Sequence, residues 1–505
     1  MSDTLFADVF VYDAGEPGGS TGVTDVLVAD QRIAAIGPSA RGLAAAGSRV
    51  VGGHGRHLLL PGLINAHFHS PANHLKGALP SLPLELFMLY ESPAHEALRP
   101  SPRQAYLRTM LGAIEMLRAG VTTVQDDAFF VPSPEPDIID AVMGAYADVG
   151  IRASVALDQP ELPEQEKLPP LAPADATTRA VLQAPAPMPM ADLLDRYRHH
   201  IATWHGAADG RLTAAVSISA PQRVSPAYFH ELDALSRTHR LPLFAHMLET
   251  KLQRTLSVEQ PRFGGRSLVG YTADLGLLSE RMNVIHAVWI DDDDIALLAE
   301  SGATVAHNPV SNLRLGSGIM PFRRLTDAGV PVALGVDEAI CHDAVDMWAV
   351  LRATGLVHNI TGADSAGWPS AAEVLRCLWT GGARALLRDG ELGEVRVGHL
   401  ADLALVDLHA LAFTPLNDLR HQLVYCASGA DVVLTMVDGR VVAEGGRVTS
   451  VDEAALLDEA REVFAAGRPA VLAAHAASSE VRPHYEQLVR RAAVADVGMS
   501  RWVEN

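Results

Sequence analysis

The chain has 505 residues, 48% of them hydrophobic and 20% charged, so it carries enough apolar material for a large buried core and is not disordered as its main state. Its 60 acidic and 40 basic residues give a formal charge of −20, which disfavours nucleic acid and anionic membrane surfaces as partners. Three widely separated cysteines disfavour a disulfide framework, and the sequence shows neither a signal peptide nor a membrane-spanning run, so we expect a cytoplasmic protein.

Both ends of the chain are rich in short extended segments. Apolar, β-branched runs predict strands at 7–12, 25–29, 33–37, 398–407 and 432–442. An Asp-Gly pair at Asp438 and Gly439 predicts a hairpin turn within the last run. We therefore expect residues 1–60 and 391–450 to form one small composite β-sandwich.

Between these ends, residues 61–390 alternate short apolar strands with helical segments. Residues 113–120 have helical character and end at a glycine, and residues 121–126 then resemble a strand. Repeated strand–helix units predict a parallel sheet covered by helices, and about 330 residues suffice for an α/β fold of the TIM-like (β/α)8 barrel type.

Two segments stand outside this alternation. Residues 160–189 contain eight prolines and little periodicity, which predicts an irregular loop that is either a lid or an exposed insertion. Residues 451–505 are rich in alanine and predict a helical tail, which packs either on the barrel or across a subunit interface.

The strongest local pattern is the pair of histidines at His67 and His69. Residues i and i+2 of a strand point to the same side, so both imidazoles project together from one strand end. Two neutral imidazoles so placed form half of a zinc or iron site. Two structural or solvent-facing histidines are the alternative interpretation of this pair taken alone.

Three further apolar strands end in side chains that bind metals, namely His246, His286 and Asp337. Glu249 follows His246 by three residues, where a general acid/base beside a metal-bound water would lie. Each of these residues alone is also compatible with a helix cap or a buried polar group.

The set is more specific than its members, because barrel active sites form where the carboxyl ends of the strands converge. The order HxH, HxxE, H, HNPxSN and D resembles the amidohydrolase superfamily, within its branch of aminohydrolases and chlorohydrolases acting on nitrogen heterocycles. The stretches PGLINAHFH (61–69) and HNPVSNLRLGSG (307–318) are especially similar, and the resemblance extends to about residue 450. It implies a (β/α)8 barrel and the same composite β-sandwich.

The resemblance also implies one divalent metal ion per chain, most naturally zinc, with iron as the alternative. Its ligands would be His67, His69, His246 and Asp337. Glu249 becomes the proton shuttle and His286 a second acid/base that orients the hydrolytic water, with Asp337 also taking part in the proton transfer. Three neutral imidazoles and one carboxylate leave a divalent ion with one net positive charge, which lowers the pKa of bound water towards neutrality. Residues 214–223 carry no lysine or carboxylate to bridge a second metal.

Substrate contacts are predicted around this centre. Gln222 offers a donor and an acceptor for an amide or amidine edge, and Phe87 offers a face for a planar ring, although a packed helix also explains Phe87. Glu338 would bind a cationic substrate group unless it faces away. Through the resemblance, His307 and Asn308 are expected to line the pocket.

The leading hypothesis is a metal-dependent hydrolytic deaminase that acts on an amino-substituted nitrogen heterocycle and releases ammonia or an amine. The alternative is a hydrolase of the same fold that opens a cyclic amide or displaces chloride, and a third hypothesis is a barrel that only binds or scaffolds. We expect a small-molecule substrate, no nucleic-acid or membrane partner, and, by similarity, a homo-oligomer, most naturally a dimer.

Overall fold

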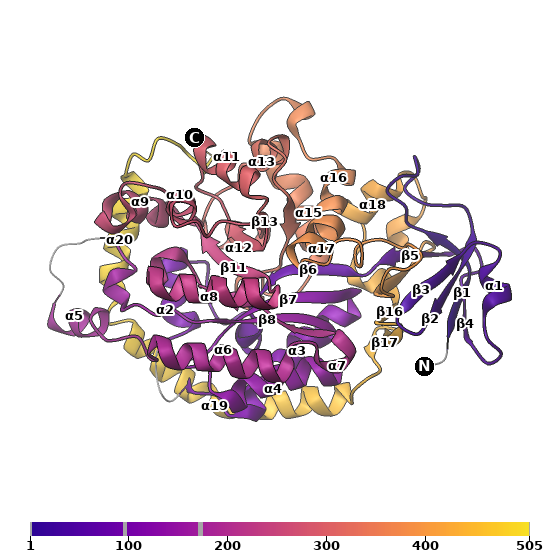
Figure 1. The fold of residues 1–505 in the computed structure, drawn as a ribbon, viewed down its shortest axis with the longest axis horizontal. Helices are drawn as coiled ribbons and strands as arrows, with labels where there is room; N and C mark the ends of the chain where they lie inside the picture. The colour runs from indigo at the N-terminus through magenta and orange to yellow at the C-terminus, as the bar shows by residue number, and fades with distance from the viewer. Residues whose placement is uncertain (1–2, 94–97, 170–174, 504–505) are drawn as a thin grey trace.

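The computed structural model describes residues 3–93, 98–169 and 175–503, and it has the expected α/β class (Figure 1). Helices surround two groups of parallel strands, and a second sheet drawn from both ends of the chain lies at one side of them. None of the helices in these three ranges is long and apolar enough to span a membrane.

The parallel strands form the centre of the molecule. They are β6 (Leu63–Phe68), β7 (Val121–Phe129), β8 (Arg152–Asp158), β9 (Leu212–Ala214), β10 (Val216–Ser217), β11 (Leu243–Met247), β12 (Met282–His286), β13 (Thr304–His307) and β14 (Val332–Leu334). In the described part of the chain, β6 to β9 pair in order as one sheet and β10 to β14 pair in order as another. The Ala215 N–H donates to the Val155 carbonyl over 2.7 Å, and Phe68 bridges Asp337 in parallel, so the two sheets meet at both edges. Burial along nearly the whole of each strand is typical of parallel strands covered by helices.

The helices follow the strands in the alternation predicted from the sequence. They are α1 (Ala40–Leu43), α2 (Leu84–Glu91), α3 (Pro102–Arg118), α4 (Pro136–Val149), α5 (Ala176–Leu182), α6 (Met190–Trp204), α7 (Ala207–Gly210), α8 (Pro226–His239), α9 (Lys251–Glu259), α10 (Leu268–Asp274), α11 (Asp292–Ser301), α12 (Pro309–Arg314), α13 (Phe322–Asp327), α14 (Ala339–His342), α15 (Met347–Val357), α16 (Ala371–Arg376), α17 (Gly382–Ala385), α18 (Leu419–Tyr425), α19 (Glu453–Ser478) and α20 (Arg482–Val494). The start of α3 shows why they begin where they do. The Ser101 hydroxyl accepts from the Gln104 N–H, the Gln104 side chain accepts from the Ser101 N–H, and proline occupies the first turn.

The terminal sheet combines strands from both ends of the chain. Its strands are β1 (Thr4–Val11), β2 (Thr24–Ala29), β3 (Arg32–Ile36), β4 (Arg49–Gly52), β5 (His57–Pro61), β15 (Leu403–Asp407), β16 (Val432–Val437), β17 (Arg440–Glu444) and β18 (Arg447–Val448). Strand β15 pairs with β5, which joins the two ends, and the predicted hairpin at Asp438 and Gly439 is confirmed between β16 and β17. The buried side chain of Arg152, on β8, forms ion pairs with Asp402 (2.7 Å) and Asp438 (3.1 Å), and it thereby ties this sheet to the parallel strands.

The proline-rich segment and the tail both pack on the strand–helix region. The prediction of an irregular segment over 160–189 is wrong for 176–182, which form α5 because the Asp175 carboxylate caps the helix by accepting from the Thr178 N–H. Residues 170–174 of that segment lie outside the described residues. In the tail, α19 packs on α2 and α3, and α20 packs on α2 and α9 (Figure 1). The tail therefore covers its own chain.

One buried histidine makes stability depend on pH. His200 in α6 donates from Nε2 to the Val155 carbonyl of β8 (2.8 Å), and burial lowers its pKa to about 4. In the unfolded chain His200 is protonated below about pH 6.5, whereas in the folded chain it is protonated only below about pH 4. The free energy of unfolding should therefore fall by about 3 kcal/mol as the pH is lowered across that window. The free energy of unfolding at pH 7.5 and pH 5, compared between the wild type and His200→Gln, isolates this contribution, since the other histidines are shared. Equal pH slopes in the two proteins would contradict it.

Candidate metal centre and active site

The four predicted metal ligands converge at the carboxyl ends of three strands. His67 lies in β6 and His69 directly follows it, His246 lies in β11, and Asp337 follows β14. Asp337 Oδ1 is 3.2 Å from His67 Nε2 and 3.6 Å from His69 Nε2. The Nε2 atoms of His69 and His246 are 3.3 Å apart. All four side chains are buried, so the group is a compact cluster screened from bulk water.

The protonation pattern of the cluster fits a cation at its centre. His246 Nδ1 is 2.8 Å from the Ser219 carbonyl, and His69 Nδ1 contacts the Asp127 carbonyl. Because a carbonyl oxygen only accepts, both Nδ1 atoms carry the proton and both Nε2 atoms present bare lone pairs. Burial lowers the pKa of His67 to about 3 and that of His246 well below its ordinary value, so these imidazoles stay neutral at neutral pH. Lone pairs facing each other at 3.3 Å repel unless a positive ion lies between them.

Glu249 and His286 lie beside this cluster. His286 Nε2 is 3.4 Å from Glu249 Oε2 and 3.8 Å from Asp337 Oδ2. Asn312 Oδ1 accepts from His286 Nδ1 at 3.0 Å, which leaves Nε2 facing the two acids. Burial, and then the nearby charge of Asp337, raises the pKa of Glu249 well above its usual value. A carboxyl group with a raised pKa suits a residue that both accepts and returns a proton.

The backbone at the strand ends is held in unusual conformations. Ser219, His286 and Asp337 have φ values of +59°, +74° and +70°, in the left-handed region that non-glycine residues rarely adopt. Gly335 lies between β14 and Asp337, and a Cβ there would come within 2.7 Å of the His67 Cβ. Such strain collects where side chains must be aimed at a common point, and here that point is the centre of the ligand cluster.

A cavity of about 480 Å³ opens over these groups. Among the predicted substrate contacts, Gln222, Glu338 and Phe87 line it. Gln222 Oε1 and Glu338 Oε2 are buried and find no hydrogen-bond partner among the described residues, so both are free to bind a ligand. The volume falls within the range of pockets for small organic molecules.

His307 and Asn308 differ from the expectation that they line the pocket, since neither borders the cavity. His307 Nε2 faces His358 Nε2 at 3.1 Å, and Asn308 Nδ2 lies 3.4 Å from His286 Nδ1. Both side chains are fully buried where β13 ends. Asn308 therefore lies behind His286 rather than on the cavity.

Sequence reasoning missed a group of acids that also face the cavity: Glu85, Glu91, Asp158 and Glu164. Burial raises the pKa of Glu91 to about 8, and burial together with the charge of Glu91 raises that of Glu338 well above its usual value. Glu85 and Glu91 sit in α2, away from any strand end, so no local sequence pattern marked them. The structure alone shows that the cavity wall is rich in carboxyl groups.

The tail and the proline-rich segment contribute the outer wall of the cavity. Val481 and Tyr485 of the tail border it, as do Pro163 and Leu168 of the proline-rich segment. The Tyr485 hydroxyl donates to Glu164 Oε1 over 2.9 Å, which fastens the two segments to each other. The described part of the proline-rich segment therefore forms part of the cavity wall.

The last residues of the chain hold the loop that supports Glu249. Trp502 Nε1 donates to the Gly316 carbonyl over 2.9 Å, and the Arg501 carbonyl accepts from the Ile319 N–H at 2.8 Å. Between these two contacts lies Ser317, whose hydroxyl donates to Glu249 Oε1 over 3.2 Å. Arg501 and Trp502 therefore help to position Ser317, a contact of Glu249 that was not predicted from the sequence.

Trp502→Ala is expected to lower the kcat of the metal-loaded protein by about 3- to 10-fold, because one hydrogen bond to the loop is worth about 0.5–1.5 kcal/mol. KM should change little, since Trp502 does not border the cavity. Trp502→Phe keeps the ring beside Trp289 but removes the N–H, and it should lose part of the same activity. Steady-state kinetics of the three proteins decides the matter, and an unchanged kcat in both variants would refute the link.

Comparisons with known proteins agree with this geometry. The model of the Amidohydrolase family matches residues 58–442. A 5′-deoxyadenosine deaminase of Methanosarcina mazei is 28% identical over 92% of this chain and 98% of its own length. A 5-methylthioadenosine/S-adenosylhomocysteine deaminase of Nitratidesulfovibrio vulgaris is 33% identical over 87% of this chain and 91% of its own. A crystal structure of an adenosine deaminase from Xanthomonas campestris with bound zinc has a TM-score of 0.78 and 28% identity, covering 93% of this chain and 99% of that one.

These comparisons confirm the predicted resemblance and the prediction of a metal-dependent hydrolytic deaminase acting on carbon–nitrogen bonds. They also support a divalent metal ion, as the cluster of bare imidazole nitrogens and a carboxylate does. The chain belongs to the amidohydrolase family.

Proposed function

We propose that the protein removes the exocyclic amino group of an aminopurine nucleoside by hydrolysis, releasing ammonia and leaving the oxopurine. The observation that carries the proposal is a buried carboxyl group, Glu249, beside a cluster of metal-ligand side chains under a cavity of about 480 Å³. The relatives named as deaminases of 5′-deoxyadenosine and of 5-methylthioadenosine and S-adenosylhomocysteine support a purine nucleoside as the substrate class.

The proposed ligands of the ion are His67, His69, His246 and Asp337. Zinc is the proposed ion, because three imidazoles and one carboxylate suit it and the similar adenosine deaminase structure contains it. When bound, the ion supplies Lewis acidity that lowers the pKa of a coordinated water towards neutrality.

The chain's own residues move the protons in this proposal. Glu249 accepts one proton from the attacking water and delivers it to the ring nitrogen next to the reacting carbon, where it stays in the product. His286, 3.4 Å from Glu249, orients the water through Nε2. The second proton of the water passes by way of Glu249 to the amino group, which then leaves as ammonia when its bond to carbon breaks.

Binding and orientation of the ring are assigned to residues of the cavity wall. The Gln222 amide suits the hydrogen-bonding edge of the purine, and Phe87 offers a flat face for stacking. Glu338 is proposed to accept a hydrogen bond from a donor group of the substrate, because its unpartnered Oε2 lies on the cavity. Asn312, which accepts from His286 Nδ1, is assigned the role of positioning His286.

We further infer that the two parallel sheets close into the (β/α)8 barrel and that the terminal sheet folds over as a β-sandwich. Contacts at both edges of the parallel sheets support the first inference, and a shared apolar cluster supports the second. That cluster draws on both ends of the chain, with Phe6, Val9, Leu403 and Met436 among its members. We also propose domain boundaries at residues 60, 390 and 450, a homodimer and a cytoplasmic location.

Ammonia release tests the proposal directly. Zinc-loaded protein would be incubated with adenosine, 5′-deoxyadenosine and 5-methylthioadenosine, and separately with amino-substituted pterins, pyrimidines and triazines. We expect at least one purine nucleoside to release ammonia. The mass of its product should show that the amino group has been replaced by an oxo group. Ammonia from only a different ring class would overturn the purine assignment. A ring-opened or dechlorinated product without ammonia would overturn deamination itself.

A further inference from the structure

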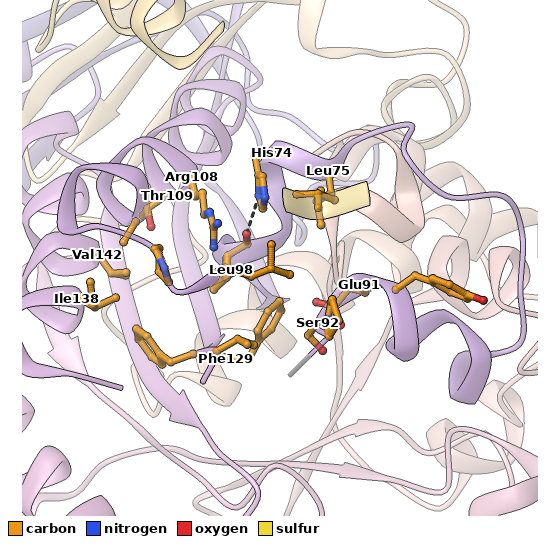
Figure 2. Close-up of a pocket in the computed structure, with 18 of the residues that line it drawn as sticks. His74, Leu75, Glu91, Ser92, Leu98, Arg108, Thr109, Phe129, Ile138 and Val142 are labelled. Atoms are coloured by element: carbon orange, nitrogen blue, oxygen red, sulfur yellow. Dashed lines mark hydrogen bonds between the residues drawn. The ribbon is translucent and has the colours of Figure 1, made fainter. Parts of the chain in front are cut away.

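A small chamber adjoins the active-site cavity and contains an arginine whose guanidinium has no partner among the described residues. The chamber has a volume of about 50 Å³ and shares Glu91, Ser92 and Phe129 with the main cavity (Figure 2). Its other walls are largely apolar, from residues such as Leu98, Ile138 and Val142. Figure 2 shows Arg108 of α3 reaching into this space near His74. The ring of Phe129 lies 5.8 Å from the ring of His69, so the chamber begins just beyond the proposed metal ligands.

The Arg108 guanidinium is uncompensated. Its Nε is buried without a hydrogen-bond partner, and no carboxylate of the described residues forms an ion pair with it. Burial lowers its pKa to about 10, so it keeps its charge at neutral pH. That charge in turn lowers the pKa of His74, after the larger effect of burial, so His74 adds no second positive charge.

Other arginines in the described residues show that this state is unusual. Six more have a buried Nε with no assigned hydrogen bond, but the guanidinium of each lies within ion-pair or hydrogen-bond distance of a carboxylate or carbonyl oxygen: Arg196, Arg211, Arg254, Arg384, Arg388 and Arg420. The Arg108 side chain is partly exposed, but its Nε is buried, and unsatisfied buried groups of this kind are typical of ligand sites.

The carboxyl group of Glu91 does not fill the role of the missing anion. It lies at the junction of the two cavities, and one of its oxygens has no partner. No ion pair joins it to Arg108 among the described contacts, and burial raises its pKa, which disfavours its charged form. The chamber therefore offers the positive charge of Arg108 within walls that are largely apolar, with room for a group of a few atoms.

We propose that this chamber, anchored by Arg108, binds a carboxylate carried by a substituent of the substrate while the ring occupies the main cavity. A guanidinium pairs with a carboxylate through two parallel hydrogen bonds, and low exposure strengthens the pair. The proposal rests on the proposed function for the identity of the ring, and it adds a charged substituent that the enzyme recognises. Arg108 sets specificity and takes no part in the chemistry at the metal centre.

A set of related substrates tests the role of Arg108 against Arg108→Met, which keeps the length of the side chain without its charge. S-adenosylhomocysteine carries both an ammonium and a carboxylate, S-adenosyl-3-thiopropylamine keeps only the ammonium, and 5-methylthioadenosine carries neither. We expect Arg108→Met to raise KM at least 10-fold for the carboxylate-bearing compound with kcat unchanged, and to leave both parameters within 2-fold for the other two. Arg108→Lys should recover part of the affinity. Equal changes for all three compounds would overturn the proposal.

A binding measurement separates failure of this proposal from failure of the proposed function. Thermal unfolding of wild type and Arg108→Met would be followed in sodium acetate, in sodium phosphate and in sodium chloride of equal ionic strength, without any substrate. We expect acetate to raise the Tm of the wild type above its value in chloride and to leave Arg108→Met unaffected. This result stands even if no nucleoside releases ammonia. If phosphate alone raised the Tm of the wild type, the proposal of a carboxylate as the ligand of Arg108 would be wrong. If the two proteins had equal Tm values in every salt, the proposal of a ligand site at Arg108 would be wrong.

Removing the charge should not harm the free protein, because Arg108 has no ion pair among the described residues to lose and its Nε is buried without a hydrogen-bond partner. Arg108→Met without ligand is therefore expected to unfold at a temperature no lower than that of the wild type. A marked loss of stability would show that Arg108 has a structural partner, and it would contradict the assignment of the chamber as a ligand site.

Discussion

Replacing Glu249 with glutamine is expected to lower kcat for ammonia release by about 10²- to 10⁴-fold, the range typical of a lost general acid/base. Glutamine has the shape of glutamate and can still accept from the Ser317 hydroxyl, which is 3.2 Å from Oε1 in the structure. It cannot take up and return a proton. The loss should therefore appear in kcat, with metal content and KM little changed. Steady-state kinetics with metal analysis of the same samples measures it.

The matched control is Glu85→Gln, the same substitution on another carboxyl group of the cavity wall. Glu85 accepts from the Thr250 hydroxyl and lies outside the metal-ligand cluster, so its loss should cost less than about 10-fold in kcat. Comparable losses from the two substitutions would mean that general cavity charge, and not proton transfer at Glu249, limits the reaction.

Stability of the metal-free protein gives a second measure of the role of Glu249. Burial raises its pKa above the value of 4.5 in the unfolded chain, so the folded state holds this proton more tightly. Its contribution to stability is then present at low pH and is lost as the pH rises from about 4.5 through the raised pKa. At pH 7 the buried carboxyl group of Glu249 therefore lowers the free energy of unfolding, and glutamine removes this effect. Metal-free Glu249→Gln should accordingly unfold at a higher temperature than the metal-free wild type, while it loses activity.

The sequence was most informative where a residue's role follows from its place on a strand. Because side chains alternate along a strand, His67 and His69 were predicted to lie on one side of it. Because strand ends converge, His246 and Asp337 were predicted to lie near them, and the structure brings these four residues together. Composition and hairpin signals likewise predicted that both ends of the chain share a sheet, and the pairing of β15 with β5 joins them.

Features that depend on packing between distant segments were not accessible from the sequence. Arg108 and Glu91 lie in helices whose rotation about their own axes decides whether they face a cavity or solvent. The sequence also did not show the left-handed backbone at His286, which turns that side chain towards Glu249. The family resemblance placed His307 on the pocket, but its side chain turns towards His358.

Arg152→Met is expected to destabilise the protein by about 3–5 kcal/mol, because it leaves two buried carboxylates without their cation. In the structure, Arg152 donates to both oxygens of Asp402, at 2.7 and 3.0 Å, and to Asp438 at 3.1 Å. Asp438 in turn accepts from the side chain of Gln31 at 2.9 Å, so strands from both chain ends meet at this one guanidinium. The free energy of unfolding by denaturant measures the loss. Arg198→Met, which removes an exposed partner of Asp195, is the control and should cost at most about 1 kcal/mol.

The same substitution should leave the chemistry intact at temperatures where the variant remains folded. Arg152 is the first residue of β8, so it lies at the amino ends of the parallel strands, whereas the metal ligands and Glu249 gather at their carboxyl ends. In folds of this architecture one face carries catalysis and the other carries stability. A kcat within about 2-fold of the wild type, measured well below the lowered Tm, is therefore the expected companion of a large loss in stability. A parallel fall in kcat would show that the terminal sheet acts on the active site through the length of the strands, and the separation of the two faces would then not hold for this enzyme.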